Sequence, residues 1–273
     1  MKSTWRLLIT PASRGAWNMA VDEAVLESVG RGDSFPTIRL YAWDPACISL
    51  GYAQPISDVD ISRLQARGWE MVRRLSGGRA VLHTDELTYS VIASLNEPRV
   101  AGTVLESYKR LAAALVEAFR MLSLPVEVQK HATPGNKTPD PICFVVPSTY
   151  EITVGGKKLV GSAQSRRKEG ILQHGTLPLT GDLARITQVL AFPDEGARAR
   201  ASIHLLERAT TVEDALGRRV SWNEAAQAFI NAFQSVLDLN LQQGDLSLEE
   251  KVKTDHLVET KYAFPNWNRK QKS

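Results

Sequence analysis

The sequence predicts an α+β fold, in which strands and helices are mixed along the chain. Segments that alternate apolar and polar residues are interleaved with segments that have the 3.6-residue apolar periodicity of helices. The chain has 273 residues, of which 43% are hydrophobic, and this is enough to bury a sizeable core. We expect residues 1–240 to form the main domain and residues 241–273 to form a helical extension that packs on it.

Helices are predicted where apolar side chains recur on one face. Residues 17–29 have such a face, and residues 103–123 form a longer apolar stripe that ends before Pro125. Ser221 and Glu224 form a capping-box pattern, which indicates that another helix begins there. The remaining expected helices are residues 57–67, 181–191, 211–216, 222–238 and 246–262.

Strands are predicted where polar and apolar residues alternate or where short apolar runs occur. The clearest example is a hairpin over residues 149–160, in which Gly155 and Gly156 supply a two-residue turn that tolerates positive φ. In that register Lys158 lies opposite Thr153, on a rigid strand. The other expected strands are residues 35–41, 47–52, 69–74, 79–83, 87–95 and 171–179.

Composition excludes several classes of protein. The formal net charge is only +3, and the basic residues do not form the clustered patch of a nucleic-acid-binding protein. Short basic groups, such as residues 166–168, suit either a solvated face or an acidic partner protein. No apolar run is long enough to span a bilayer, and the first residues lack the apolar region of a signal peptide. We therefore expect a cytoplasmic protein without membrane association.

The number and spacing of the cysteine and histidine residues limit which disulfides and metal sites the chain can form. The two cysteines, Cys47 and Cys143, are too few for a disulfide framework, which fits a reducing compartment. The five histidines lack metal-ligand spacing, so we expect no structural metal. Cys47 lies in an apolar segment typical of a core strand, whereas residues 130–142 predict a polar, proline-rich loop that leads into Cys143.

The most informative segment is RRLSGGRAVLH, residues 73–83. Gly77 and Gly78 lack a Cβ, so the backbone there can approach a ligand closely, and the flanking arginines make the segment cationic. This combination suits an acidic or phosphate-bearing group, or the oxyanion of an acyl transfer. The same pattern also fits an ordinary glycine bulge with solvated arginines.

Three blocks of the chain resemble, in order, the motifs of the biotin/lipoate protein ligase catalytic-domain family. They are residues 18–24, residues 73–83, and residues 155–164 followed by 173–177. Three ordered matches are more specific than one glycine motif. The setting Cys143-Phe144 with Pro147-Ser148 is similar to that of the octanoyltransferases of the LipM type within this family. The resemblance implies the family's fold, a mixed β-sheet with helices packed against it, and makes residues 1–240 its catalytic domain.

The resemblance also implies an activity. It is that of an octanoyl-[acyl carrier protein]:protein N-octanoyltransferase in lipoate biosynthesis. Octanoyl-acyl carrier protein would donate the acyl group to Cys143 as a thioester. A lysine of a lipoyl domain or of the glycine-cleavage H protein would then accept it. This chemistry needs no metal and no organic cofactor, and we expect the enzyme to be a monomer.

The resemblance assigns roles to particular residues. Cys143 would be the nucleophile, and Lys158 the cation that activates its thiolate and stabilises the tetrahedral oxyanion. The other residues would line the acyl site: Arg73, Gly77, Gly78, Arg79, His83, Gly161, Ser162, Ala163 and His174. Asn18 and Asp22 would order the first helix against this site. From pattern alone, Cys143 also fits a small buried side chain, Lys158 a solvated lysine, and the two histidines structural residues.

Two alternatives stay open. One is an ATP-dependent lipoate–protein ligase, and the other is a non-catalytic homologue that binds lipoyl domains. A ligase would not need Cys143, and Arg79 stands where ligases have a third glycine, so both residues favour the transferase. A biotin ligase is disfavoured because its Gly-Arg-Gly-Arg-x-Gly pattern is absent. The preferred acyl length and the acceptor protein are left undetermined.

Overall fold

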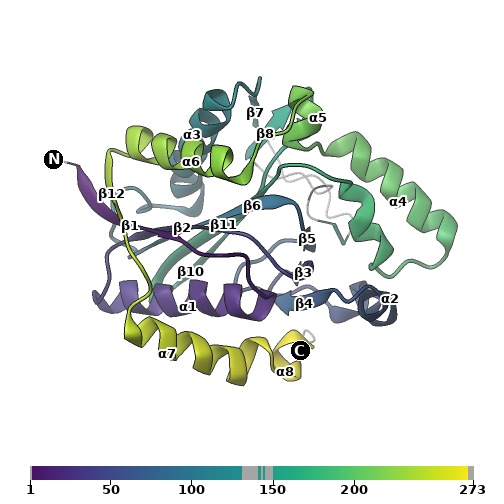
Figure 1. Cartoon of the computed structure of the whole chain (residues 1–273), viewed down its shortest axis with the longest axis horizontal. Coiled ribbons are helices and arrows are strands. Elements are labelled where there is room, and N and C mark those ends of the chain that lie inside the picture. The colour runs from purple at the N-terminus through teal and green to yellow at the C-terminus, as the bar shows by residue number, and fades with distance from the viewer. Residues whose placement is uncertain (1, 131–140, 143, 145–149, 270–273) are drawn as a thin grey trace.

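A computed structural model describes residues 2–130, 141–142, 144 and 150–269. At its centre is a six-stranded mixed sheet (Figure 1). Its strands, in spatial order, are β10 (Gly161–Arg167), β11 (Gly170–Pro178), β6 (Glu86–Ala93), β2 (Thr37–Tyr41), β1 (Ser3–Ile9) and β12 (Leu239–Gln243). The first four strands pair antiparallel, whereas β1 runs parallel to both β2 and β12. The α+β fold class is therefore confirmed.

Two smaller sheets stand beside the large one. The first has the order β4 (Glu70–Arg73), β3 (Cys47–Leu50) and β5 (Val81–His83). The second has the order β7 (Glu127–Lys130), β8 (Tyr150–Val154) and β9 (Lys157–Lys158). In the hairpin of β8 and β9, Thr153 is the partner of Lys158, so the register expected from the glycine turn is confirmed.

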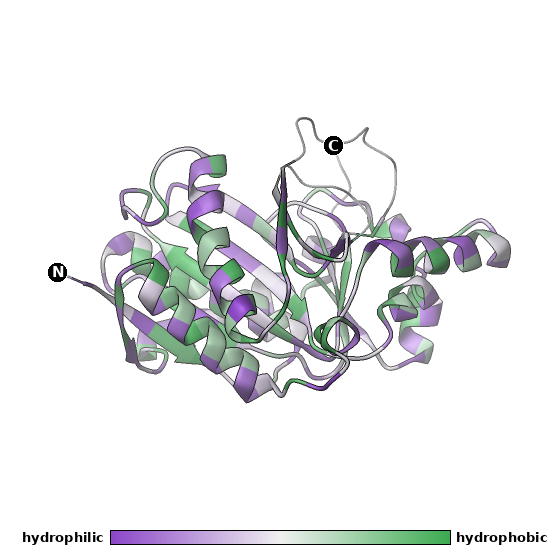
Figure 2. Ribbon diagram, turned by 90° about the horizontal axis from the view of Figure 1, so that it is seen from above, coloured by the Kyte–Doolittle hydropathy of each residue, from purple (hydrophilic) through white to green (hydrophobic). Residues whose placement is uncertain are grey.

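Helices cover both faces of the large sheet (Figure 1). One face carries α1 (Gly15–Arg31) and α7 (Leu248–Leu257), and the other carries α3 (Val104–Met121) and α6 (Trp222–Val236). The remaining helical segments are η1 (Ile56–Asp58), α2 (Ile61–Ala66), η2 (Leu183–Gln188), α4 (Glu195–Arg208), α5 (Val212–Leu216), the π-helical turn η3 (Val258–Tyr262) and α8 (Pro265–Asn268). Figure 2 shows hydrophilic and hydrophobic stripes alternating around these helices. Across the described ranges, no helix has both the length and the apolarity that crossing a membrane requires.

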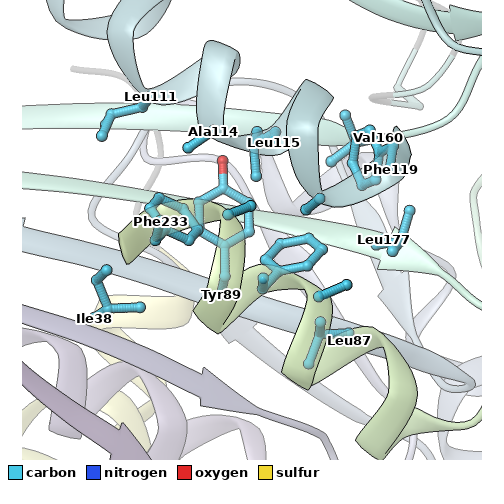
Figure 3. Packing of buried hydrophobic residues seen from close by; sticks show 14 of the residues in the cluster. Ile38, Leu87, Tyr89, Leu111, Ala114, Leu115, Phe119, Val160, Leu177 and Phe233 are labelled. Atoms are coloured by element: carbon cyan, nitrogen blue, oxygen red, sulfur yellow. The ribbon is translucent and has the colours of Figure 1, made fainter. Parts of the chain in front are cut away.

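The largest part of the core lies between the sheet and the helices α3 and α6. Tyr89 of β6 points into this layer, where its ring lies 5.8 Å from that of Phe229 and 6.2 Å from that of Phe233. Phe119 of α3 meets Phe229 edge-on at 5.9 Å. Figure 3 shows Tyr89 and Phe233 beneath Leu111 and neighbouring residues of α3. This aromatic cluster joins both helices to the central strand of the sheet.

Partly buried ion pairs hold the C-terminal helices against the opposite face of the sheet. Glu250 of α7 binds Arg6 of β1 at 2.6 Å, and Lys261 of η3 binds Glu23 of α1 at 2.6 Å. The domain boundary expected at residue 240 falls inside β12, which pairs with β1 along its whole length.

Several elements differ from the sequence-based expectation. Helices α1, α3 and α6 are confirmed, but β1, β7, β10, β12 and α4 were not expected. Strand β10 has the sequence GSAQSRR and is half-buried at the edge of the sheet, so it lacks the apolar alternation that predicts a strand. Helix α4 buries little of its surface and has a correspondingly weak apolar stripe. Most of the loop expected at residues 130–142, like Cys143, lies outside the described residues.

The aromatic cluster predicts which core substitution is most damaging. Phe229→Ala removes a fully buried ring that contacts both Tyr89 and Phe119, and should lower the free energy of unfolding by about 3–5 kcal/mol. Phe264→Ala is the matched control, since that ring is 47% exposed, and should change stability by no more than about 0.5 kcal/mol. Urea denaturation of both variants measures the difference, and equal losses would contradict the assignment of Phe229 to the core.

Candidate active site

A partly open cavity lies where the large sheet meets the β4-β3-β5 sheet and helix α1. Its wall includes five residues of the expected acyl site, namely His83, Gly161, Ser162, Ala163 and His174. The other lining residues among those described are Met19, Tyr41, Trp43, Ser49, Arg74, Val81, Thr88, Gly175 and Thr176. Segments far apart in the sequence therefore converge on one cavity.

Small residues on β10 and β11 make room for this cavity. The pairing of the two strands places Ser162 beside Gly175 and Ala163 beside His174. A Cβ built on Gly175 would lie 2.6 Å from Ser162 Oγ and 2.7 Å from a ring carbon of Tyr89, so only glycine fits there. Ser162 Oγ and the Tyr89 hydroxyl hydrogen bond at 2.8 Å. The polar atoms in this part of the wall are thus satisfied by one another.

His174 is held between a carboxylate and a hydroxyl. Its Nδ1 lies 3.5 Å from Asp22 Oδ2, and its Nε2 lies 2.5 Å from Ser76 Oγ. Burial lowers the pKa of His174, although Asp22 opposes this, and the charge of Arg74 adds to the lowering. Burial also resists ionisation of Asp22, but hydrogen bonding to His174 and the charge of Arg39 outweigh it and lower the pKa of Asp22. The site therefore favours a neutral imidazole beside an ionised carboxylate.

His83 has a similar environment on the other side of the cavity. Its Nδ1 hydrogen bonds to Glu86 Oε1, and its Nε2 lies 2.8 Å from Ser49 Oγ. The indole of Trp43 stacks on the imidazole, with ring centroids 3.9 Å apart. Thr88 donates to the same Glu86 oxygen at 2.8 Å and accepts from Trp43 Nε1 at 2.9 Å. The orientation of His83 is therefore determined by contacts on both nitrogens and on the ring face.

The arginine of the cavity wall is Arg74 and not Arg73. Arg74 donates to the carbonyls of Ser49, Gly77 and Arg79, each at 2.8 Å, and thereby closes the glycine-containing loop. Arg73 points to the other side of the strand. Its guanidinium binds backbone carbonyls, including those of Gly51 at 2.8 Å, Gln54 at 2.6 Å and Asn268 at 2.9 Å.

Gly77, Gly78 and Arg79 form the loop at the edge of the cavity and are not among its lining residues. Gly78 has φ +92°, a conformation that favours glycine. The loop also packs closely on the preceding strand, because a Cβ on Gly51 would lie 2.0 Å from the Gly78 carbonyl oxygen. The glycine pair therefore allows a tight turn, and the hydrogen bonds from Arg74 hold this turn in place.

Lys158 lies apart from this wall, on strand β9. It is 7% exposed and forms an ion pair with Glu151 of β8 at 3.1 Å. Its Nζ is 6.0 Å from the centre of the Phe144 ring. Lys157 instead points to the surface, where it donates to the Leu206 carbonyl at 2.7 Å. The two neighbouring lysines thus have opposite orientations, as the strand register predicts.

Cys143, the expected nucleophile, lies outside the described residues, but parts of its surroundings are described. Ile142 forms a β-bridge with Ala80, and the Ala80 amide donates to the Pro141 carbonyl at 2.9 Å. The other cysteine, Cys47, is fully buried in β3, as expected, and burial raises the pKa of its thiol well above the ordinary value. Cys47 is therefore poorly suited to act as a nucleophile.

Several residues around His83 were given no individual role from the sequence. They are Trp43, Ser49, Thr88 and Glu86. The one local signal is the three-residue spacing of His83 and Glu86 across a tight strand connection. Within the described ranges, no group of three or more His, Cys, Asp and Glu side chains could hold a metal ion.

Comparisons with known proteins agree on one family. Residues 14–234 match the family model described as the lipoyl protein ligase A/B catalytic domain. The chain is 40% identical to a Brevibacillus brevis protein named octanoyltransferase LipM, over 97% of this chain and 98% of the relative. A Bacillus subtilis protein of the same name is 37% identical over 99% of both chains.

Solved structures agree as well. A bipartite lipoate protein ligase from Thermoplasma acidophilum, described with its E2 lipoyl domain, has a TM-score of 0.81 and 26% identity, covering 100% of this chain and 99% of the other. A lipoate-protein ligase A bound with ATP has a TM-score of 0.77 and 27% identity, covering 98% of this chain and 99% of the other.

The environment of His174 predicts how stability depends on pH. Because the pKa of His174 is lower in the folded protein than the value of about 6.5 in an unfolded chain, stability is greatest above that pH and falls as the pH drops below it. His174→Gln removes the titrating imidazole. The free energy of unfolding of this variant should therefore decrease less between pH 7.5 and pH 5.5 than that of the original protein.

The matched control is His204→Gln, because His204 is a half-exposed residue of α4. This variant should keep the original pH dependence. Denaturant titrations at the two pH values measure both effects. Identical pH dependence in the His174 variant and the original protein would contradict the proposed titration of His174.

Proposed function

Because the chain belongs to the lipoyl protein ligase A/B catalytic-domain family, we propose that it is an octanoyltransferase of lipoate biosynthesis. The observation that carries this proposal is the similarity, over nearly the whole chain, to proteins named octanoyltransferase LipM. The acceptor is a lysine of a lipoyl domain or of the glycine-cleavage H protein, and the donor is octanoyl-acyl carrier protein. In this proposal the enzyme works as a monomer in the cytoplasm and needs no metal or organic cofactor.

The reaction has two acyl-transfer steps. In the first, the thiolate of Cys143 attacks the carbonyl carbon of the donor thioester, a new C–S bond forms, and the thiol of the donor leaves. In the second, the amine of the acceptor lysine attacks the acyl-enzyme, a C–N bond forms, and Cys143 leaves. The acyl group thus passes from one thioester to another and then to a stable amide.

The cavity suits the acyl chain of this reaction. Gly161, Ala163 and Gly175 in its wall leave space that larger side chains would fill. Several of its polar side chains bond to other protein groups, as His83 does to Glu86 and Ser49, and the surface of the cavity is mostly apolar. The Thr176 hydroxyl is an exception, because it has no partner among the described residues. Binding of an unbranched aliphatic chain in such a space is favourable, because it removes apolar surface from water.

Lys158 is proposed as the cation that assists Cys143. Two observations support this role. The buried ion pair with Glu151 holds the ammonium group in one orientation on a strand, and the group lies near Phe144, which follows Cys143 in the sequence. A fixed ammonium group in this position would favour the thiolate over the thiol and stabilise the oxyanion of each tetrahedral intermediate.

The first test is intact-protein mass spectrometry after mixing with octanoyl-acyl carrier protein in the absence of ATP. We expect an octanoyl increment that hydroxylamine removes and that is absent in Cys143→Ala. Cys47→Ala is the matched control and should keep the increment, because Cys47 is buried with a raised thiol pKa. Labelling of a lipoyl domain only when ATP and free acid are supplied would mean a ligase. Binding of the lipoyl domain with no acyl transfer would mean a non-catalytic homologue.

The two adjacent lysines give a second test. Lys158→Ala should lower the rate of octanoyl transfer to a lipoyl domain by about 100- to 1,000-fold, because it removes a buried positive charge that stabilises developing negative charge. Lys157→Ala should keep nearly the original rate, since this side chain points to the surface. Single-turnover kinetics measures both variants, and a fully active Lys158 variant would remove the role given to this residue.

A further inference from the structure

The acyl cavity runs across four strands of the large sheet, from an edge toward the interior. Its lining residues include members of β10, β11, β6 and β2, which are neighbours in that order. At the β10 edge the wall is partly exposed, at Ser162 and Ala163. At the other end Tyr41, Trp43 and Met19 line the cavity, and each is no more than 5% exposed. The cavity therefore opens near β10 and is closed beside β2 and helix α1 (Figure 1).

The direction of a bound acyl chain follows from this shape. A thioester donor is attached to a carrier protein, which is too large to enter the cavity, so the carbonyl end of the chain must stay near the opening. Lys158 of β9, the proposed oxyanion-stabilising residue, precedes the first β10 residue, Gly161, by only three positions. The methyl end of the chain therefore points inward, toward Tyr41, Trp43 and Met19.

Two of the three residues at the closed end are held by hydrogen bonds. The Tyr41 hydroxyl donates to Asp22 at 3.1 Å, and Trp43 Nε1 donates to Thr88 Oγ1 at 2.9 Å. A smaller residue at either position would leave a buried polar group without this partner. Met19 is different, because its thioether is at most a weak acceptor and the side chain fills space by packing. Its size can therefore change without disturbing a hydrogen bond.

The backbone of Met19 is fixed by its neighbours on α1. The Asn18 side chain donates to the Ala42 carbonyl at 3.0 Å and accepts from Arg39 at 2.6 Å. Asp22, one turn further along the helix, forms a buried ion pair with Arg39 at 2.8 Å. Helix α1 cannot move inward without breaking these contacts, so space left by a smaller side chain in place of Met19 would stay open.

We propose that Met19 limits the length of the acyl chain, because its side chain closes the inner end of the cavity against the terminal methyl of the octanoyl group. This inference rests on the proposed octanoyltransferase function and assigns the preference for a medium chain to one side chain. Truncation to alanine removes the atoms beyond Cβ and makes room for about two further methylene groups. Each methylene that is newly buried favours binding by a factor of about four.

The test is a competition between octanoyl- and decanoyl-acyl carrier protein for transfer to a lipoyl domain. In Met19→Ala the ratio of decanoylated to octanoylated product should rise about 15-fold over that of the original protein, since two more methylene groups are buried. Mass spectrometry of the lipoyl domain measures this ratio. Both donors compete for the same enzyme molecules, so the ratio does not depend on how much of the variant is folded.

Two control variants separate chain length from general damage. Met19→Leu nearly conserves the side-chain volume and should keep the original product ratio. Leu26→Ala removes another buried side chain of α1, one that is not among the described residues lining the cavity. It should lower stability without changing the product ratio. An unchanged ratio in Met19→Ala, or an equal rise in Leu26→Ala, would overturn the inference.

Binding of free fatty acids separates this inference from the proposed function. Calorimetric titration with octanoate and decanoate needs no acyl transfer, and Met19→Ala should shift the ratio of the two affinities toward decanoate. If the original protein transfers no acyl group without ATP, the proposed octanoyltransferase function fails, and the affinity ratio still decides the role of Met19. An unchanged affinity ratio would overturn that role. Absence of both transfer and binding in the original protein would overturn both proposals.

Discussion

The Asp22 carboxylate joins helix α1 to three strands of the large sheet. It accepts hydrogen bonds from Arg39 at 2.8 Å, from the Tyr41 hydroxyl at 3.1 Å and from Ser90 at 2.8 Å, and it lies 3.5 Å from His174 Nδ1. Arg39 is fully buried, so each charge depends on the other for compensation. The position of α1, the orientation of His174 and the shape of one cavity wall all follow from this cluster.

The acyl cavity is bounded by two histidines with parallel surroundings. Each has a carboxylate at Nδ1 and a serine hydroxyl at Nε2, Asp22 and Ser76 for His174, Glu86 and Ser49 for His83. These contacts give both ring nitrogens of each histidine a partner within the protein. A rigid, internally bonded wall of this kind can offer a mostly apolar surface to an acyl chain.

The same fold serves ligases and transferases, so the distinction between them must lie in particular side chains. A lipoate-protein ligase A that shares this fold has been described bound with ATP. A transferase receives an already activated acyl group and has no need to bind a nucleotide.

The sequence by itself determined the elements whose signals are local. The apolar stripes of α1, α3 and α6, the turn at Gly155 and the resulting orientation of Lys158 all arise from residues close together in the chain. Tertiary structure alone decided that Arg74 rather than Arg73 faces the cavity, because adjacent residues of a strand point to opposite sides and no pattern says which side holds the ligand. It also decided the pairing of β1 with β12 and the contact of His83 with Ser49, since strand partners and hydrogen bonds between distant segments depend on how the whole chain packs.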